Sequence, residues 1–247
     1  MDPGCGRERP DLTDAWTERS PNREDGLVVD DEFINSRTTE VSLPGGGRVR
    51  IRPVVPEDKA ALVEGFRRLS PESRYRRFMA PIAELSEDQL VELTEVDYRD
   101  RFAWMAFSLD EPGTPGMGVA RYVRDAEDPE VAEAAVTVID DYHGRGLGRL
   151  LLEFLGAVAL ENGIARFRGY ALEDNRAIRE PLTHLGASLA HDSPGLLRFE
   201  LDLPAQAEEL RGSPMYEVLR AVARGDAPIL AKPVDLSGEP RTSTRPV

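Results

Sequence analysis

A glycine-rich turn between two apolar segments constrains the fold of this chain more than any other stretch. Residues 134–139 form an apolar run, residues 140–149 read DDYHGRGLGR, and residues 150–160 are again apolar, an order that predicts strand, turn and helix. The turn carries glycines at alternate positions, Gly144, Gly146 and Gly148. Because glycine has no Cβ atom, the backbone there can come close to a ligand. The following helix points its unpaired N–H groups and the positive end of its dipole into the turn, which predicts an anion site, best suited to phosphate.

Composition limits the class of protein. The 247 residues are 40% hydrophobic, which suits one domain with tails, or two small domains, with a sizeable core. The formal net charge of −14 argues against nucleic acid or an anionic membrane as the main partner. An anionic ligand therefore needs a local positive site, which Arg145, Arg149 and the helix N-terminus can supply.

Cysteine and histidine usage predicts a reduced protein without a metal. The single cysteine, Cys5, allows no disulfide within the chain and no cysteine-based zinc cluster. His184 and His191 are not accompanied by the carboxylates or cysteines that would complete a metal site. The sequence shows neither an apolar run of transmembrane length nor a signal-peptide pattern at Met1, so we expect a cytoplasmic location.

The composition changes twice along the chain and predicts three parts. Residues 1–40 are rich in charged residues, Pro and Ser with few apolar residues, which predicts a disordered acidic tail. A folded domain is expected over residues 41–204. Residues 205–247 are expected to form a helical extension, amphipathic over residues 205–224, followed by a loose tail.

Within the domain, residue patterns predict a regular succession of elements. A hairpin about Pro44–Gly47 is followed by helices that start at Pro56, at Ser70-Pro71 and at Ser86. An antiparallel meander comes next, with strands at residues 101–109, 117–124 and 131–139. The last predicted elements are the helix 147–160, a strand at 165–171, a helix capped by Asp174 or Asn175 and interrupted by Pro181, and strands at 187–190 and 196–203.

This order resembles the GNAT superfamily of N-acetyltransferases over roughly residues 48–203. The family signature, Q/R-x-x-G-x-G/A on the turn after the central strand, is matched by residues 143–148, with His143 in place of Gln or Arg. Residues 69–78 and 132–134 further resemble the branch that contains the Pat-type bacterial protein lysine acetyltransferases. The resemblance implies an α+β (three-layer) fold, in which a mixed, mostly antiparallel central sheet is flanked by helices.

The resemblance also implies a co-substrate and the residues that bind it. The co-substrate is acetyl-CoA, with its pyrophosphate on the turn and its pantetheine arm paired with the preceding strand. The implied binding residues are Thr137, Val138, Ile139, His143, Gly144, Arg145, Gly146, Leu147, Gly148, Arg149 and Asn175. The acceptor is an amine, either on a small molecule or on a protein lysine.

Glu133 corresponds to the Glu that serves as general base in the Pat-type branch. An amine must lose a proton to attack a thioester, and a carboxylate whose pKa is raised by apolar neighbours can accept it. The alternative interpretation is a surface Glu at a strand end, next to Glu130. Leu182 stands where the family often carries a Tyr general acid, so no acid is assigned.

Two further alternatives follow from the turn. His143 is interpreted as a structural residue that bonds the loop backbone, with a catalytic role as the alternative. For the whole protein, the alternative to an enzyme is a catalytically weak acyl-CoA-binding sensor or regulatory module.

Overall fold

The computed structural model describes residues 31–78, 81–111, 116–175, 179, 183, 186–203 and 234–235. Its α-helices are α2 (Asp31–Ser36), α3 (Lys59–Arg67), α4 (Pro71–Phe78), α5 (Glu87–Thr94) and α6 (Leu147–Glu161), with 3₁₀ turns η1 (Pro56–Asp58) and η2 (Asp140–Tyr142). Its strands are β1 (Thr39–Ser42), β2 (Arg48–Pro53), β3 (Arg101–Ser108), β4 (Gly118–Arg124), β5 (Val131–Val138), β6 (Arg166–Leu172), β7 (Ser188–Ser193), β8 (Leu196–Asp202) and β9 (Val234–Asp235).

The strands of the described part form one nine-stranded sheet in the order β7-β8-β6-β5-β4-β3-β2-β1-β9. Strands β1 to β5 pair antiparallel in succession, apart from the helical insertion between β2 and β3. Strand β6 pairs parallel to β5, and β8 and β7 continue antiparallel. The predicted α+β fold with a mixed, mostly antiparallel sheet is confirmed, as are the hairpin and the meander.

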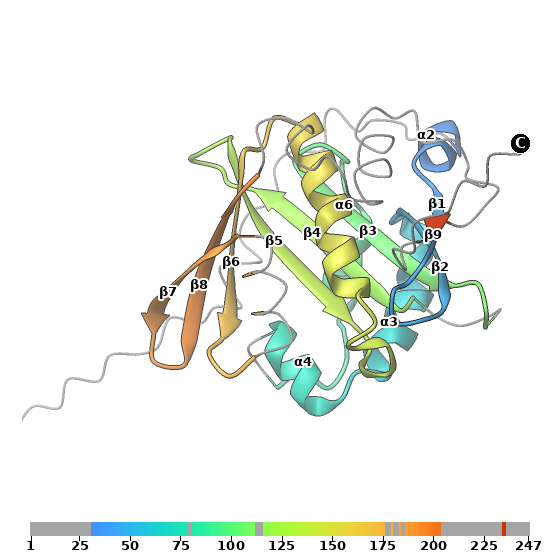
Figure 1. Cartoon of the computed structure of the whole chain (residues 1–247), viewed down its shortest axis with the longest axis horizontal. Helices are drawn as coiled ribbons and strands as arrows, with labels where there is room; N and C mark the ends of the chain where they lie inside the picture. The colour runs from blue at the N-terminus through green and yellow to red at the C-terminus, as the bar shows by residue number, and fades with distance from the viewer. Residues whose placement is uncertain are drawn as a thin grey trace, which may run out of the picture.

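Helix α6 covers one face of the sheet, over β3, β4 and β5 (Figure 1). It is apolar almost all round, and ten of its residues are buried. Phe154 packs edge-on against Trp104 of β3, with 5.6 Å between ring centroids. This helix carries the predicted glycine turn at its start, so burial of the helix fixes the turn relative to the sheet.

Strand β4 shows how the two faces of the sheet differ. Ala120 and Tyr122 point into the core that α6 shares, whereas Val119 and Arg121 face a cavity walled by α3 and α4. Alternation of side chains along a strand accounts for this division. The sheet therefore separates a mainly apolar layer, shared with α6, from a second layer that contains the buried charge of Arg121.

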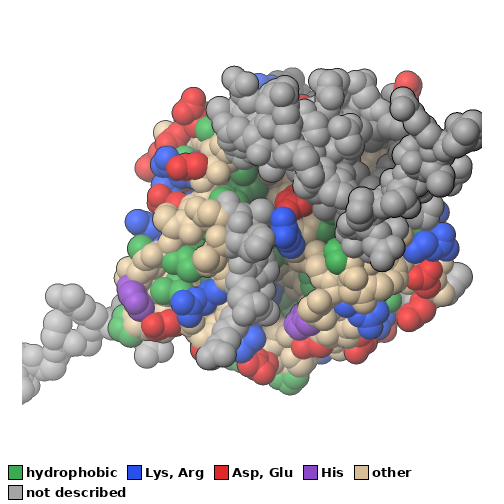
Figure 2. All heavy atoms as spheres, viewed as in Figure 1, with side chains coloured by type: hydrophobic (Ala, Val, Ile, Leu, Met, Phe, Trp, Pro, Cys, Tyr) green, Lys and Arg blue, Asp and Glu red, His purple; other side chains and the backbone are tan. Residues whose placement is uncertain are grey.

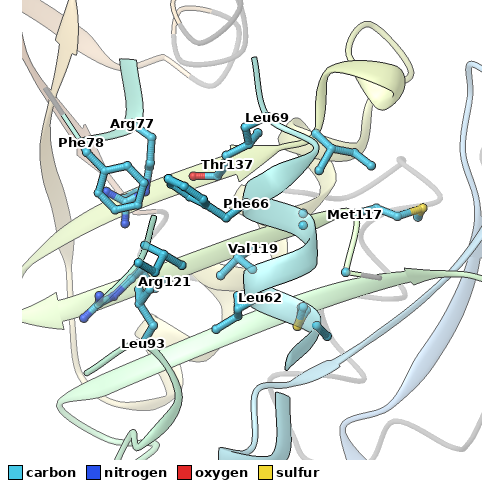
Figure 3. A pocket seen from close by; sticks show the side chains of 18 residues that line it. Leu62, Phe66, Leu69, Arg77, Phe78, Leu93, Met117, Val119, Arg121 and Thr137 are labelled. Carbon is cyan, nitrogen blue, oxygen red and sulfur yellow. The ribbon is translucent and has the colours of Figure 1, made fainter. Parts of the chain in front are cut away.

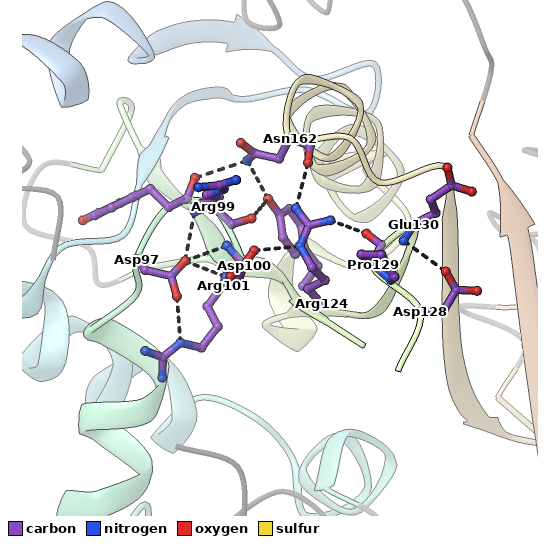
Figure 4. Close-up of polar contacts among 11 residues, drawn as sticks. Asp97, Arg99, Asp100, Arg101, Arg124, Asp128, Pro129, Glu130 and Asn162 are labelled. Atoms are coloured by element: carbon purple, nitrogen blue, oxygen red, sulfur yellow. Dashed lines mark hydrogen bonds and ion pairs between the residues drawn. The ribbon is translucent and has the colours of Figure 1, made fainter. Parts of the chain in front are cut away.

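A polar network fixes the end of α6 near the start of β5 (Figure 4). Arg124 of β4 donates from Nε to Asp100 at 2.7 Å and from Nη2 to the carbonyl of Asn162 at 2.7 Å, and it also bonds the carbonyl of Pro129. Asn162 follows the last residue of α6, and its amide donates to the hydroxyl of Tyr122 at 2.7 Å. The network holds the turn before β5 and the end of α6 to the same strand.

Ordered structure begins before the predicted boundary at Val41. Residues 31–40 include helix α2 and the start of β1, where Phe33 packs edge-on against Tyr98 at 5.2 Å between ring centroids. Arg37 pairs with Glu161 at the end of α6. Partial burial of one aromatic ring, one ion pair and the pairing of β1 with β2 help to offset the entropy cost of ordering this short segment.

Several predictions concern residues outside the described ranges. They include disorder over residues 1–30, the extension over residues 205–247 apart from β9, and most of the helix predicted after Asn175.

The cap predicted at Ser86 is present, since its hydroxyl accepts from the Gln89 amide.

Charged side chains are interspersed on the face of the molecule that Figure 2 shows. Acidic and basic groups alternate across the visible described surface and do not separate into broad areas of one sign. Within the described ranges, none of the helices has the length and apolarity needed to cross a bilayer.

Candidate active site

Strands β5 and β6 pair over only three residues and then diverge (Figure 1). The parallel register joins Val131 to Arg166, Ala132 to Phe167 and Glu133 to Arg168. From residue 134 to residue 138, the edge of β5 that faces β6 has no strand partner among the described residues. Gly169 lies at the point of divergence, where an added Cβ atom would come within 2.7 Å of the Ala134 carbonyl oxygen. The result is an open backbone edge that leads away from Glu133.

Register along β5 determines which backbone groups face the opening. The Ile139 amide donates to the Met117 carbonyl at 2.9 Å, so the backbone of Ile139 is bonded to the β4 side. Groups alternate along an antiparallel strand, so the backbone of Thr137 also faces β4, and that of Val136 and Val138 faces the opening. Of the predicted trio, Val138 therefore presents its backbone, and Val136 is an additional candidate that the sequence did not indicate.

The glycine turn is built as its sequence requires. Gly144 and Gly146 have φ angles of 73° and 87°, in the left-handed region that glycine tolerates best. A Cβ atom added at Gly144 would meet nothing within 4 Å, so this side of the turn is open. Helix α6 starts at Leu147, and its first backbone bond runs from the Leu150 amide to the Gly146 carbonyl. The amides of the first turn, among them that of Gly148, are therefore available to an anion.

The side chains of the turn are largely occupied by contacts within the protein. His143 Nε2 lies 2.8 Å from the carbonyl oxygen of Val138, which ties the turn to the end of β5. The guanidinium of Arg145 lies 4.5 Å from the ring centroid of Tyr142. Arg149 Nε donates to Glu153 at 2.8 Å. The geometry agrees with a structural role for His143, and it leaves anion binding mainly to backbone amides.

The β1–β2 hairpin supports the turn from behind. The amide of Gly45 donates to the carbonyl of Arg145 at 3.3 Å. A Cβ atom at Gly45 would lie 2.6 Å from the Cα of Arg145, and one at Gly146 would lie 3.3 Å from Cδ of Pro44. The two loops are packed backbone to backbone, so the position of the hairpin sets the position of the turn.

Glu133 lies where β5 and β6 diverge, half-buried and among charged side chains. Burial raises the pKa of Glu133 above its usual range, Arg77 and Arg121 lower this pKa, and the net direction is upward. Arg121 is 4% exposed and donates to Glu92 at 3.2 Å. Burial and the neighbouring Arg121 lower the pKa of Arg77 to about 10, so Arg77 stays protonated at neutral pH. Glu133 is therefore a carboxylate with a raised pKa between two cations.

An apolar cavity of about 60 Å³ lies beside these charges, on the face of the sheet opposite α6. Figure 3 shows Arg77 and Arg121 together at one end, with Leu62, Phe66 and Val119 along the middle. Thr137 of β5 lines the cavity with its side chain, although its backbone faces β4. The cavity thus combines an apolar wall with a charged end.

Asn175, the remaining predicted binding residue, lies in the turn after β6. Its amide donates to the Leu172 carbonyl at 3.0 Å, while its side-chain Oδ1 is buried without a hydrogen-bond partner among the described residues. A buried, unsatisfied carbonyl oxygen favours a ligand that brings an N–H group. Leu182 lies outside the described ranges. No group of three metal-ligating side chains occurs within the residues that the structure describes.

Comparison of the sequence and the fold with known proteins identifies the family of this chain. Residues 48–188 match the family described as Acetyltransferase (GNAT) domain. The chain is 36% identical over 154 residues to Acetyltransferase Pat of Mycolicibacterium smegmatis, a match that covers 62% of this chain and 45% of that protein. The chain thus spans less than half the length of this relative.

Two solved structures share the arrangement. The GNAT domain of S. lividans PAT aligns with a TM-score of 0.63 and 31% identity, over 71% of this chain and 99% of that chain. A cAMP-binding acyltransferase from Mycobacterium smegmatis aligns with a TM-score of 0.52 and 30% identity, over 79% of this chain and 57% of that chain. The resemblance to GNAT proteins of the Pat type is confirmed, and this chain belongs to the GNAT acetyltransferase family.

Proposed function

We propose that this protein is an acetyl-CoA-dependent N-acetyltransferase that transfers an acetyl group to an amine. The observation that carries the proposal is the continuity of one element. Strand β5 begins near Glu133, continues as an open backbone edge and ends in the glycine turn of α6. A phosphate site, an extended edge and a carboxylate in this order suit a long ligand that reacts at the end remote from its phosphates.

The residues present fit acetyl-CoA. The pyrophosphate would be held by amides of residues 144–149, with little contribution from Arg149, whose guanidinium is paired with Glu153. The amide-bearing pantetheine arm would pair with the backbone of Val136 and with the amide of Val138, whose carbonyl bonds His143 Nε2. Asn175 would receive an N–H group at its unsatisfied Oδ1. Bound in this way, the thioester supplies the acetyl group and would lie near the divergence of β5 and β6.

Glu133 would act as the general base. A lysine amine has a pKa near 10.4, so roughly one in a thousand or fewer is neutral at pH 7. Glu133 accepts the amine proton as nitrogen attacks, the new C–N bond forms, the C–S bond breaks, and the departing thiolate is protonated from solvent. Arg77 and Arg121 contribute electrostatically, because positive charge keeps Glu133 ionised and disfavours the protonated amine.

The cavity supports an acceptor whose amine sits on an aliphatic stem. Such a stem would lie along Leu62, Phe66 and Val119 with its nitrogen toward the charged end. Both a protein lysine and a small-molecule amine fit this description. An acyl-CoA sensor is the second candidate, favoured by Leu182 in place of the family's tyrosine.

Calorimetric titration with acetyl-CoA tests the feature that both candidates share. We expect one site with micromolar to low-millimolar affinity, and folded protein that shows no heat change at millimolar acetyl-CoA would refute both. Release of free thiol in the presence of a panel of amines and lysine-bearing proteins then distinguishes the enzyme from the sensor. Binding without thiol release for any acceptor would favour the sensor.

Gly45→Ala is expected to weaken acetyl-CoA binding by about tenfold although Gly45 touches no ligand. The new Cβ atom would lie 2.6 Å from the Cα of Arg145, so the turn must shift. Gly46→Ala is a control in the same hairpin: its φ of 88° strains the backbone locally, but no atom lies within 4 Å of an added Cβ, so nothing pushes on the turn. Calorimetry on both variants measures the effect. An affinity of Gly45→Ala equal to that of the unsubstituted protein would show that the hairpin does not position the turn.

A further inference from the structure

Helix α4 forms one wall of the acceptor cavity, yet it has little packing of its own. None of its eight residues is fully buried. Arg77 and Phe78, at its C-terminal end, line the cavity, and Phe78 contacts Phe66 of α3 at 5.7 Å between ring centroids. A helix with so few buried side chains depends on polar contacts for its position.

The N-terminal end of α4 is attached to the glycine turn through one carboxylate. Asp140 accepts from the Ser70 amide at 2.9 Å, from the Ser70 hydroxyl at 2.9 Å and from the Ser73 hydroxyl at 2.8 Å. The Ser73 amide donates in turn to the Ser70 hydroxyl at 3.1 Å, which caps the helix. These contacts join residues about 70 positions apart in the sequence. Asp140 therefore accepts the hydrogen bonds that the residues at the start of α4 donate. These bonds fix the distance between the start of α4 and the end of β5.

Asp140 also belongs to the backbone of the turn itself. It is the first residue of η2, and its carbonyl accepts from the His143 amide at 3.1 Å, one residue before Gly144. A ligand that orders residues 144–149 therefore restricts the main chain to which the Asp140 carboxylate is attached. Hydrogen bonds from Ser70 and Ser73 hold the pKa of Asp140 below its usual range despite partial burial, so the carboxylate is ionised at neutral pH.

Its neighbour Asp141 makes a different kind of contact. Asp141 pairs with Arg68 at 2.8 Å, and its side chain is 68% exposed. Solvent screens an exposed ion pair, and such pairs contribute little to rigidity. The two adjacent carboxylates thus have different partners. Asp140 is hydrogen-bonded to the start of α4, whereas Asp141 forms an exposed ion pair with Arg68, the residue after α3.

We propose that Asp140 is a positioning residue that couples occupancy of the glycine turn to the placement of α4, and so of Arg77 and Phe78 at the acceptor cavity. This inference rests on the proposed function, because it takes CoA as the ligand of the turn. Cofactor binding would order the acceptor wall before the amine arrives. By linkage, an ordered wall would strengthen cofactor binding to the same extent.

Hydrogen–deuterium exchange of the full chain tests the coupling without an acceptor. CoA itself is the probe, and exchange is followed in peptides that cover residues 71–78, with CoA binding measured separately by calorimetry. In the unsubstituted protein and in Asp141→Asn, saturating CoA is expected to slow exchange in α4 by about fivefold or more. In Asp140→Asn, which keeps the size but loses the charge and one acceptor oxygen, CoA should still bind but no longer protect α4.

The outcomes separate this inference from the proposed function. If CoA binds the unsubstituted protein and exchange in α4 does not change, the coupling is refuted while the cofactor assignment stands. If CoA does not bind at all, both fall together. Protection that persists in Asp140→Asn assigns the coupling to another contact and overturns the role of Asp140. Ser73→Ala removes the Ser73 hydroxyl, with its bond to Asp140 and its contact with the Ser70 hydroxyl, but keeps both bonds from Ser70 to Asp140. It gives a milder test if Asp140→Asn does not fold, and reduced protection is expected there too.

Discussion

Gly146→Val is expected to abolish acetyl-CoA binding, with a loss of affinity of at least about 100-fold. Gly146 adopts a φ of 87° at the start of α6, a region that a β-branched residue scarcely enters. An added Cβ atom would also approach Pro44 Cδ to 3.3 Å. The backbone must therefore rotate, and the amides of the first turn of α6 would no longer point together at the bound pyrophosphate. Loss of two charge-assisted hydrogen bonds, at about 1.5–3 kcal/mol each, accounts for a change of that size.

Gly163→Val is the matched control for this prediction. Gly163 lies just beyond the other end of α6, with a φ of 78° and no atom within 4 Å of an added Cβ. Both variants therefore carry similar backbone strain and should lose similar amounts of unfolding free energy. Calorimetry measures acetyl-CoA affinity, and chemical denaturation measures stability. Retained affinity in Gly146→Val, in a protein that denatures normally, would show that the turn serves another purpose.

Local patterns explain why much of the fold could be predicted. The apolar run, the alternate glycines and the mostly apolar helix are adjacent in the sequence, so predicting the strand–turn–helix unit needs no long-range information. The same holds for the Ser86 cap, whose partner Gln89 is three residues away. The meander of β3, β4 and β5 follows because sequential strands joined by short turns usually pair.

The surroundings of the candidate site could not be predicted from the sequence and became clear only from the three-dimensional structure. Residue type does not reveal which neighbouring strand a residue's backbone groups face, so the sequence of β5 does not indicate that Val136 and Val138, rather than Thr137, present backbone to the opening. In the sequence, Asp140 is simply one acidic residue of a polar turn. Its partner Ser70 lies 70 positions earlier, so no local pattern predicts their contact. Likewise, Arg77 reaches the neighbourhood of Glu133 from helix α4, more than 50 positions earlier in the sequence. Contacts of this kind leave no periodic or local signal.

Glu133→Gln is expected to lower the turnover number about 10²–10⁴-fold while leaving acetyl-CoA affinity unchanged. The amide has nearly the shape of the carboxylate, so the strand and the cavity are preserved, but it cannot accept the amine proton. Because burial raises the pKa of Glu133 above its usual range, the acid limb of the rate profile should lie above the ordinary carboxyl range. This limb is expected to vanish in the variant, since the titrating group has been removed.

Glu130→Gln provides the control, because Glu130 is exposed in the turn just before β5 and its backbone carbonyl, not its side chain, bonds residues 165 and 166. Its turnover should match that of the unsubstituted protein. Rates are compared at about pH 7 and about pH 9, where the rising fraction of neutral amine makes a base less necessary. The deficit of Glu133→Gln should therefore shrink as the pH rises. Turnover equal to that of Glu130→Gln at both pH values would exclude Glu133 as the base, and a constant deficit would assign it an electrostatic role in place of proton transfer.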